Sequence, residues 1–101
     1  MNLRVAHDAE AEKEFREAVA WYEERAEGLG VRFVREVDKV MAAIVSQPFR
    51  FPKARRHSWK ARVLGWPYSI YFAVNEGHRE VKVLAFWHGA RHPGELRRRL
   101  K

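Results

Sequence analysis

The stretch that decides the fold is AEKEFREAVAWYEERAEGLGVRFVREVDKVMAAIVSQP, residues 11–48. On both sides of Gly28-Leu29-Gly30, apolar side chains recur three or four positions apart, which predicts two amphipathic helices joined by a tight turn. Asp8 occupies a helix N-cap position before the first helix, and Pro48 marks the end of the second. Helices so close along the chain are expected to form an antiparallel hairpin whose apolar stripes face a core.

The segments around this hairpin alternate between apolar and polar residues, as β-strands do. Residues 2–7 predict a first strand, and a loop with two prolines covers residues 48–57. Alternation then returns over residues 57–64, 68–74 and 80–87, with Asn75-Glu76-Gly77 as a hairpin turn. We therefore predict a single α+β domain over residues 1–101 with the order β-α-α-β-β-β. Its antiparallel sheet, which the first strand also joins, carries the helical hairpin on one face.

The other face of this sheet is unusual for a face in contact with solvent. The register expected to face the helices consists of Ile70, Phe72, Val74, Val81, Val83 and Ala85. The opposite register is half apolar and half basic, with Tyr71, Ala73, Leu84 and Phe86 beside Lys60, Arg62, Lys82 and His88. Because a solvated face should alternate more cleanly to polar residues, we expect something to dock there. The alternative is that the C-terminal tail folds back over it.

Charge and composition narrow the class of protein. The 101 residues carry a net charge of +7, and residues 50–62 and 91–101 are rich in arginine and lysine. This asymmetry favours a basic surface that faces nucleic acid or an acidic protein partner. The absence of cysteine excludes disulfides and thiolate metal sites. With no apolar run of membrane-spanning length, the expected location is the cytoplasm, without membrane association.

The candidate chemistry is cationic, and neither a cofactor nor a metal site is expected. If the loop, the second strand and the end of the last strand converge, they form an anion-binding cluster of Lys53, Arg55, Arg56, Arg62, His88 and Arg91. Metal-free RNA cleavage would use His88 as the acid or base, with Arg62, Arg55 and Lys53 stabilising phosphorane charge. The alternative is that His88 is a structural hydrogen-bonding residue and that Arg91 orients the C-terminal segment.

Several motifs, taken in order, resemble the ParE/RelE toxin superfamily. They begin with Ala18-Val19-Ala20-Trp21-Tyr22-Glu23-Glu24, followed by Gly28-Leu29-Gly30 and Phe33. The stretch Ile-Val-Ser-Gln-Pro-Phe-Arg-Phe-Pro at 44–52 is similar to the loop between helix and strand in that family. Further matches are Arg62-Val63-Leu64, Trp66-Pro67-Tyr68-Ser69-Ile70-Tyr71, and Val83 to His88 with Arg91 and Pro93. The set is co-linear and spans nearly the whole chain.

The resemblance implies the toxin of a type II toxin–antitoxin system, of the kind that inhibits growth and stabilises plasmids. A cognate antitoxin would neutralise it in a complex, docking on the second sheet face and the basic loop. The residues expected to bind there are Arg56, Lys60, Tyr71, Lys82, Leu84, Phe86 and Arg91.

The superfamily offers two targets. ParE-like members act on DNA gyrase without catalysis, and the long Trp-Tyr-Glu helix with its Gly-Leu-Gly turn favours this reading. RelE-like members cut messenger RNA on the ribosome, which would use Lys53, Arg55, Arg62 and His88. The tail of this chain lacks the terminal tyrosine of some nuclease members. A third possibility is an inactive homologue that only binds an antitoxin or nucleic acid.

Overall fold

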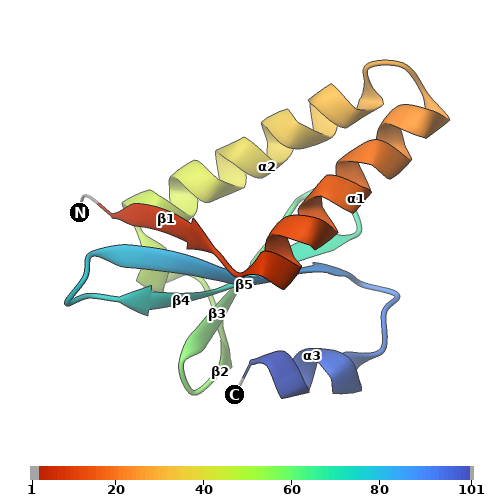
Figure 1. Cartoon of the computed structure of the whole chain (residues 1–101). Coiled ribbons are helices and arrows are strands. Elements are labelled where there is room, and N and C mark those ends of the chain that lie inside the picture. Colours follow the sequence, from red (N-terminus) through yellow and green to blue (C-terminus); the bar gives the residue numbers. More distant parts are fainter. Residues whose placement is uncertain (1–2, 101) are drawn as a thin grey trace.

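The computed structural model describes residues 3–100 as a five-stranded sheet with helices on both faces (Figure 1). The elements are, in chain order, β1 (Arg4–His7), α1 (Ala9–Arg25), α2 (Leu29–Ser46), a 3-10 turn η1 (Pro48–Arg50), β2 (Lys53–Arg55), β3 (Ser58–Arg62), β4 (Tyr68–Asn75), β5 (Glu80–His88) and α3 (Pro93–Arg99). The predicted α+β class and the β-α-α-β-β-β order are confirmed. Two elements are added, because β2 forms inside the predicted loop and the tail forms α3.

The strand order is β1-β5-β4-β3-β2. β2 to β5 pair antiparallel, as predicted, but β1 pairs parallel with β5, so the sheet is mixed. The hairpin accounts for this difference, since α1 and α2 together return the chain to the end of the sheet from which β1 started. β5 therefore lies between β1 and β4, next to the edge strand β1, and β4 is the central strand.

The helical hairpin packs against one face of the sheet, as Figure 1 shows. Phe33 of α2 is fully buried there, and its ring lies 4.8 Å from the ring of Tyr22 of α1 and 5.7 Å from that of Phe86 of β5. Burial of such rings is the main favourable contribution to the folding of so small a domain. The predicted core positions on this face are confirmed for Ile70, Phe72, Val74, Val81 and Val83.

A β-bulge reverses the face assignment at the end of β5. Tyr71 pairs with Ala85 while Phe72 pairs with Val83, so Leu84 is an extra residue on β5. A one-residue insertion turns every later side chain to the opposite face. The prediction was therefore wrong beyond Leu84: Phe86 belongs to the core under the helices, and Ala85 lies on the other face.

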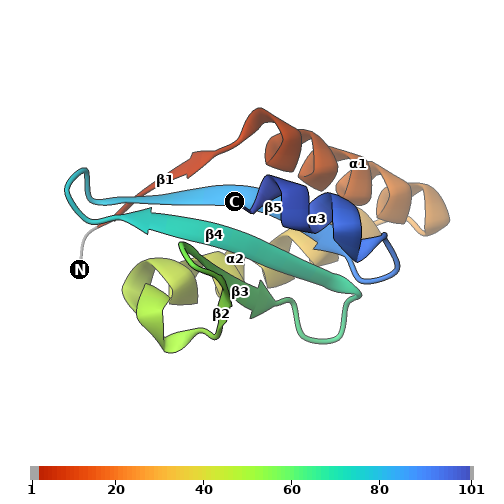
Figure 2. The same ribbon diagram turned by 90° about the horizontal axis from the view of Figure 1, so that it is seen from below.

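The second sheet face is covered by α3, which lies across β5 and β4 in Figure 2. Leu96 and Leu100 are buried against Tyr71, Ala85 and Trp87 in a second, smaller apolar cluster. The expected free docking face is thus occupied within the described chain, and the alternative of a tail that folds back is the correct one. The tail folds back because the spacing of Leu96 and Leu100 places both apolar side chains on one side of a helix, which packs against the sheet.

Candidate functional site

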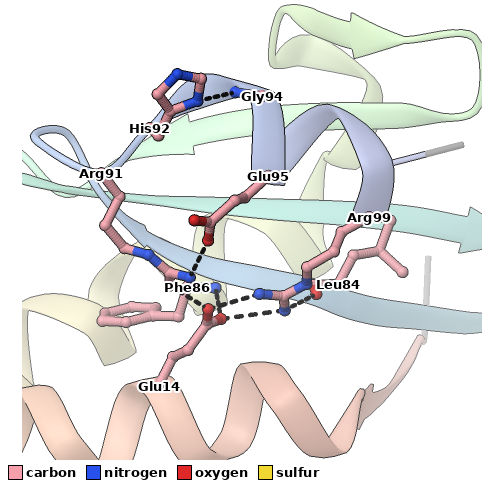
Figure 3. A network of polar contacts seen from close by, with 8 residues as sticks. All are labelled: Glu14, Leu84, Phe86, Arg91, His92, Gly94, Glu95 and Arg99. Atoms are coloured by element: carbon pink, nitrogen blue, oxygen red, sulfur yellow. Dashed lines mark hydrogen bonds and ion pairs between the residues drawn. The ribbon is translucent and has the colours of Figure 1, made fainter.

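A single carboxylate from α1 fastens α3 to the rest of the protein (Figure 3). Both guanidinium nitrogens of Arg99 donate to Glu14, at 2.6 and 3.1 Å, and Arg91 donates to the same carboxylate. The backbone N–H of Phe86 donates to Glu14 at 3.0 Å. Arg99 also donates to the carbonyl oxygen of Leu84 at 2.7 Å. These bonds join α1, the bulged end of β5 and the tail, and we call Glu14, Arg91 and Arg99 the Glu14 network.

The Glu14 network shifts the acid–base properties of its members. Burial alone would raise the pKa of Glu14, but the hydrogen bonds from Arg99, Phe86 N–H and Arg91 outweigh it and hold the pKa below 4.5, its ordinary value. Burial alone would lower the pKa of Arg91, yet its bonds to Glu14 and Glu95 raise it above the ordinary value. The Glu14 carboxylate and the Arg91 guanidinium are therefore both charged at neutral pH.

This lowered pKa predicts an acid-sensitive tail. Because the pKa of Glu14 is lower in the folded than in the unfolded chain, its contribution to stability is fully present above pH 4.5 and is lost as the pH falls through the folded-state value. We expect the free energy of unfolding of the wild type to fall more steeply below pH 4.5 than that of Glu14→Gln. Urea titrations at a series of pH values measure this, and parallel profiles for the two proteins would contradict it.

Beside the Glu14 network, a groove of about 780 Å³ runs between α1 and the ends of β4 and β5. Trp21, Tyr22, Tyr68 and His88 line it together with several charged side chains of α1. Burial raises the pKa of Tyr68 above its ordinary value of 10.0, so its phenol stays protonated.

His88 already has a structural partner. Its Nδ1 accepts from the backbone N–H of Ala90 at 2.9 Å, and its ring packs edge-on to Tyr68 at 5.1 Å. These contacts hold the turn after β5, as expected in the structural reading of this histidine.

The predicted cationic cluster does not assemble. His88 pairs with Tyr68, whereas Lys53 lies on β2, three strands away, opposite Trp59. With strands about 4.8 Å apart and about 3.4 Å per residue along them, these two residues are about 14 Å apart across the sheet and farther along it. Lys53 instead donates to the carbonyl of Arg56 at 2.6 Å. His88 is therefore out of reach of Lys53, and the set of residues that RNA cleavage would use is not brought together.

The other predicted residues are dispersed. Arg55, Arg56 and Lys60 lie on the β2–β3 hairpin, and Arg62 ends β3 beside α2. Three residues lie under or beside α3: Tyr71 is buried in the second cluster, Leu84 is half-buried there, and Arg91 stacks 3.6 Å above the Trp87 ring. Lys82 is exposed and lies 4.0 Å from Asp8. Arg91 thus helps to hold the C-terminal segment, as the structural alternative predicted.

Residues 5–93 match the family described as the ParE toxin of the type II toxin–antitoxin system parDE. The chain belongs to this family. No curated protein matches it in sequence. Family membership makes the chain the toxin component of a type II toxin–antitoxin system, and it confirms the resemblance found in the sequence.

Solved structures share the fold of this ParE-family chain at low sequence identity. The chromosomal ParDE system from P. aeruginosa superposes with a TM-score of 0.65 at 14% identity, covering 86% of this chain and 96% of that one. The isolated E. coli RelE toxin gives 0.62 at 17%, covering 98% and 99%. The archaeal RelE–RelB complex from Pyrococcus horikoshii gives 0.60 at 15%, covering 91% and 100%. At these identities the likeness shows the fold alone.

Sequence reasoning missed the central member of the site in this ParE-family chain. Glu14 reads as one of several acidic residues on α1, and only the folded chain brings it to Arg99, 85 positions later. A signal for α3 did exist: Pro93 follows His92, whose Nδ1 accepts from Gly94 N–H at 2.9 Å as a helix cap, and Leu96 and Leu100 follow at helical spacing. Among the described residues, no group of three or more metal-binding side chains gathers, and no helix is long and apolar enough to cross a membrane.

Proposed function

We propose that this toxin inhibits DNA gyrase by binding it, without catalysis of its own. The observation that carries the proposal is the dispersal of the candidate catalytic groups, since His88 holds a turn at one corner of the sheet and Lys53 holds a hairpin at another. General acid–base catalysis requires such groups within hydrogen-bonding reach of one substrate. The match to the ParE rather than to a nuclease family supports the same target.

The surface of the helical hairpin supports binding to a protein. Trp21 and Val31 are exposed by 51% and 53%, and the guanidinium of Arg25 lies 4.0 Å above the Trp21 ring. Tryptophan and arginine are the side chains most enriched among residues that dominate binding energy at interfaces. We assign this tryptophan–arginine pair to the contact with gyrase.

The second partner in this proposal is a cognate antitoxin, which neutralises the toxin in a hetero-oligomeric complex in the cytoplasm. Among the structures that share the fold, the P. aeruginosa ParDE structure is described as a toxin–antitoxin system, and an E. coli RelE mutant is described in complex with an antitoxin RelBc peptide. A partner of this kind fits a toxin that must be held inactive until it is released.

The test measures two activities of the purified chain side by side. One assay follows supercoiling of a relaxed plasmid by gyrase, and the other follows cleavage of messenger RNA on translating ribosomes. We expect inhibited supercoiling and intact message. Cleaved message with normal supercoiling would replace the proposal with the ribonuclease reading. If the chain neither inhibited supercoiling nor cleaved the message, it would be an inactive homologue that only binds an antitoxin.

The variant His88→Ala separates binding from cutting. In the proposed mechanism, its inhibition of gyrase equals that of the wild type, because His88 supplies no chemistry. A nuclease that used His88 as acid or base would lose about 100-fold or more in rate. Dose–response curves in the supercoiling assay provide the measurement, and thermal denaturation confirms that the variant is folded. A 100-fold loss of potency in a folded variant would contradict the proposal.

A further inference from the structure

One segment of this protein carries an excess of positive charge equal to the net charge of the whole chain. Residues 39–75 hold seven of the twenty lysines and arginines and no aspartate or glutamate. The thirteen basic residues outside this segment are therefore balanced by the thirteen acidic ones, and the segment alone accounts for the net charge of +7. Charge distributed in this way produces a strong local field on an otherwise neutral protein.

The fold places five of the seven cations of this segment, those at positions 53–62, on the β2–β3 hairpin at one edge of the sheet. Strand β2 ends the strand order, and the hairpin projects at the lower left in Figure 1. Arg55, Arg56 and Arg62 are exposed, and Lys60 is half-buried. Within residues 3–100, the ion pairs of this segment involve Lys39 alone, which contacts Glu36. The cations of the hairpin thus remain available to an external anion.

The hairpin is held in a fixed shape. Lys53 donates to the carbonyl of Arg56 across the turn, and its ammonium lies 4.4 Å from the Trp59 ring. Trp59 in turn stacks on Phe72 of the core. A rigid hairpin presents its charges in a fixed arrangement, so a partner does not have to order it on binding.

Helix α3 extends the basic surface. Ala54 of β2 packs against the cluster that contains Leu96 and Leu100, so α3 and the hairpin are neighbours. Arg99 turns toward α1, where it bonds to Glu14. Arg97 lies about 200° around the helix from Arg99, on the flank toward β4 and β3. Arg97 and Arg98 are exposed and make no ion pair among the described residues. We call Arg55, Arg56, Lys60, Arg97 and Arg98 the basic edge.

The basic edge presents charge and few aromatic faces. Proteins that bind single-stranded nucleic acid stack its bases on exposed aromatic rings. Here Tyr71 is buried beneath α3, and Trp59 packs between Phe72 and Phe49. Phe49 is exposed by 46%, but it belongs to η1 on the helix side of the sheet. Rigid cations without a stacking platform suit a duplex, whose bases are paired inside and whose phosphates are outside.

We propose that the basic edge binds the phosphate backbone of double-stranded DNA, so that the toxin contacts the DNA held by its target as well as the target itself. That gyrase supplies the DNA duplex rests on the proposed function. The binding of duplex DNA itself is a property of this chain alone. Phosphate contacts of this kind are independent of sequence and weaken steeply with salt. They would increase the affinity of the toxin for gyrase that already holds DNA.

The experiment compares two triple variants of equal charge. In Arg55→Gln/Arg56→Gln/Lys60→Gln the basic edge loses three cations, and in the control Lys13→Gln/Arg32→Gln/Arg35→Gln the helices lose three exposed ones. Fluorescence anisotropy measures binding to a random-sequence DNA duplex of two helical turns, without gyrase, over a range of salt concentrations. Each lost phosphate contact makes the slope of log K against log salt shallower by about 0.9.

For the basic-edge variant we expect at least about tenfold weaker binding and a slope shallower by about 2.7, while the control keeps the slope of the wild type. Equal losses in both variants would overturn the inference, because net charge alone would then explain binding. Tighter binding to a single-stranded RNA of the same length would also overturn it. The supercoiling assay on the wild type is read separately. Normal DNA binding without gyrase inhibition would refute only the proposed function, and inhibition without DNA binding only this inference.

Discussion

Glu14→Gln is expected to lower the free energy of unfolding by about 3 kcal/mol, because it leaves a partly buried arginine pair without its counter-charge. The Glu14 side chain is only 10% exposed and that of Arg99 21%, so water replaces the lost interaction poorly. Glutamine keeps the size of the side chain, and the loss therefore reports charge rather than packing. For a domain of this size, the expected fall in melting temperature is about 15 °C.

The matched control is Glu12→Gln on the same helix. Glu12 pairs with Arg16 at 2.7 Å, but both side chains are more than half exposed, and such pairs contribute about 0.5 kcal/mol. Urea denaturation followed by tryptophan fluorescence compares the two variants, with Trp87 as a reporter because α3 buries it. Equal losses in the two variants would show that the Glu14 network does not hold the tail.

The predictable part of this fold is the part encoded by local periodicity. The helical hairpin and the three long strands follow from spacing and punctuation alone, because each apolar stripe spans several turns or pleats. The parallel pairing of β1 was not predictable in this way, since it depends on where the hairpin returns the chain. The short β2 strand was missed for a related reason: three residues are too few to establish an alternation.

The candidate site was harder to predict because its geometry depends on one extra residue. Nothing in the sequence of β5 distinguishes Leu84 as the bulged position, yet the bulge moves Phe86 into the core and His88 toward α1. The predicted nuclease cluster assumed a continuous alternation of side chains along β5. It also assumed that residues able to share one chemical task lie close together in space. The grouping of Arg55, Arg56 and Lys60 was predictable, because a tight hairpin keeps neighbours in sequence together.

Gly30→Ala is expected to lower the free energy of unfolding by about 2 kcal/mol, although alanine is the better helix former. A Cβ at this position would lie 2.9 Å from the carbonyl oxygen of Val19 and 2.9 Å from a carboxylate oxygen of Glu23, both on α1. The backbone atom cannot rotate away, so the two helices must separate. The same carboxylate accepts from the N–H of Gly28 and of Gly30, each at 2.9 Å, and this cap at the start of α2 would be lost as well.

Two other glycines show whether steric crowding or backbone conformation causes the loss of stability in Gly30→Ala. A Cβ on Gly77 would meet only the Asn75 side chain, at 3.5 Å, so Gly77→Ala should be nearly neutral. Gly28 has φ +83° with open space around it. Gly28→Ala should therefore lower the free energy of unfolding by about 1 kcal/mol, solely because alanine is strained in the left-handed conformation. Chemical denaturation of all three measures the order. If Gly30→Ala cost no more than Gly28→Ala, close helix packing would not be the reason for this glycine. The hairpin that presents Trp21 would then tolerate a wider turn.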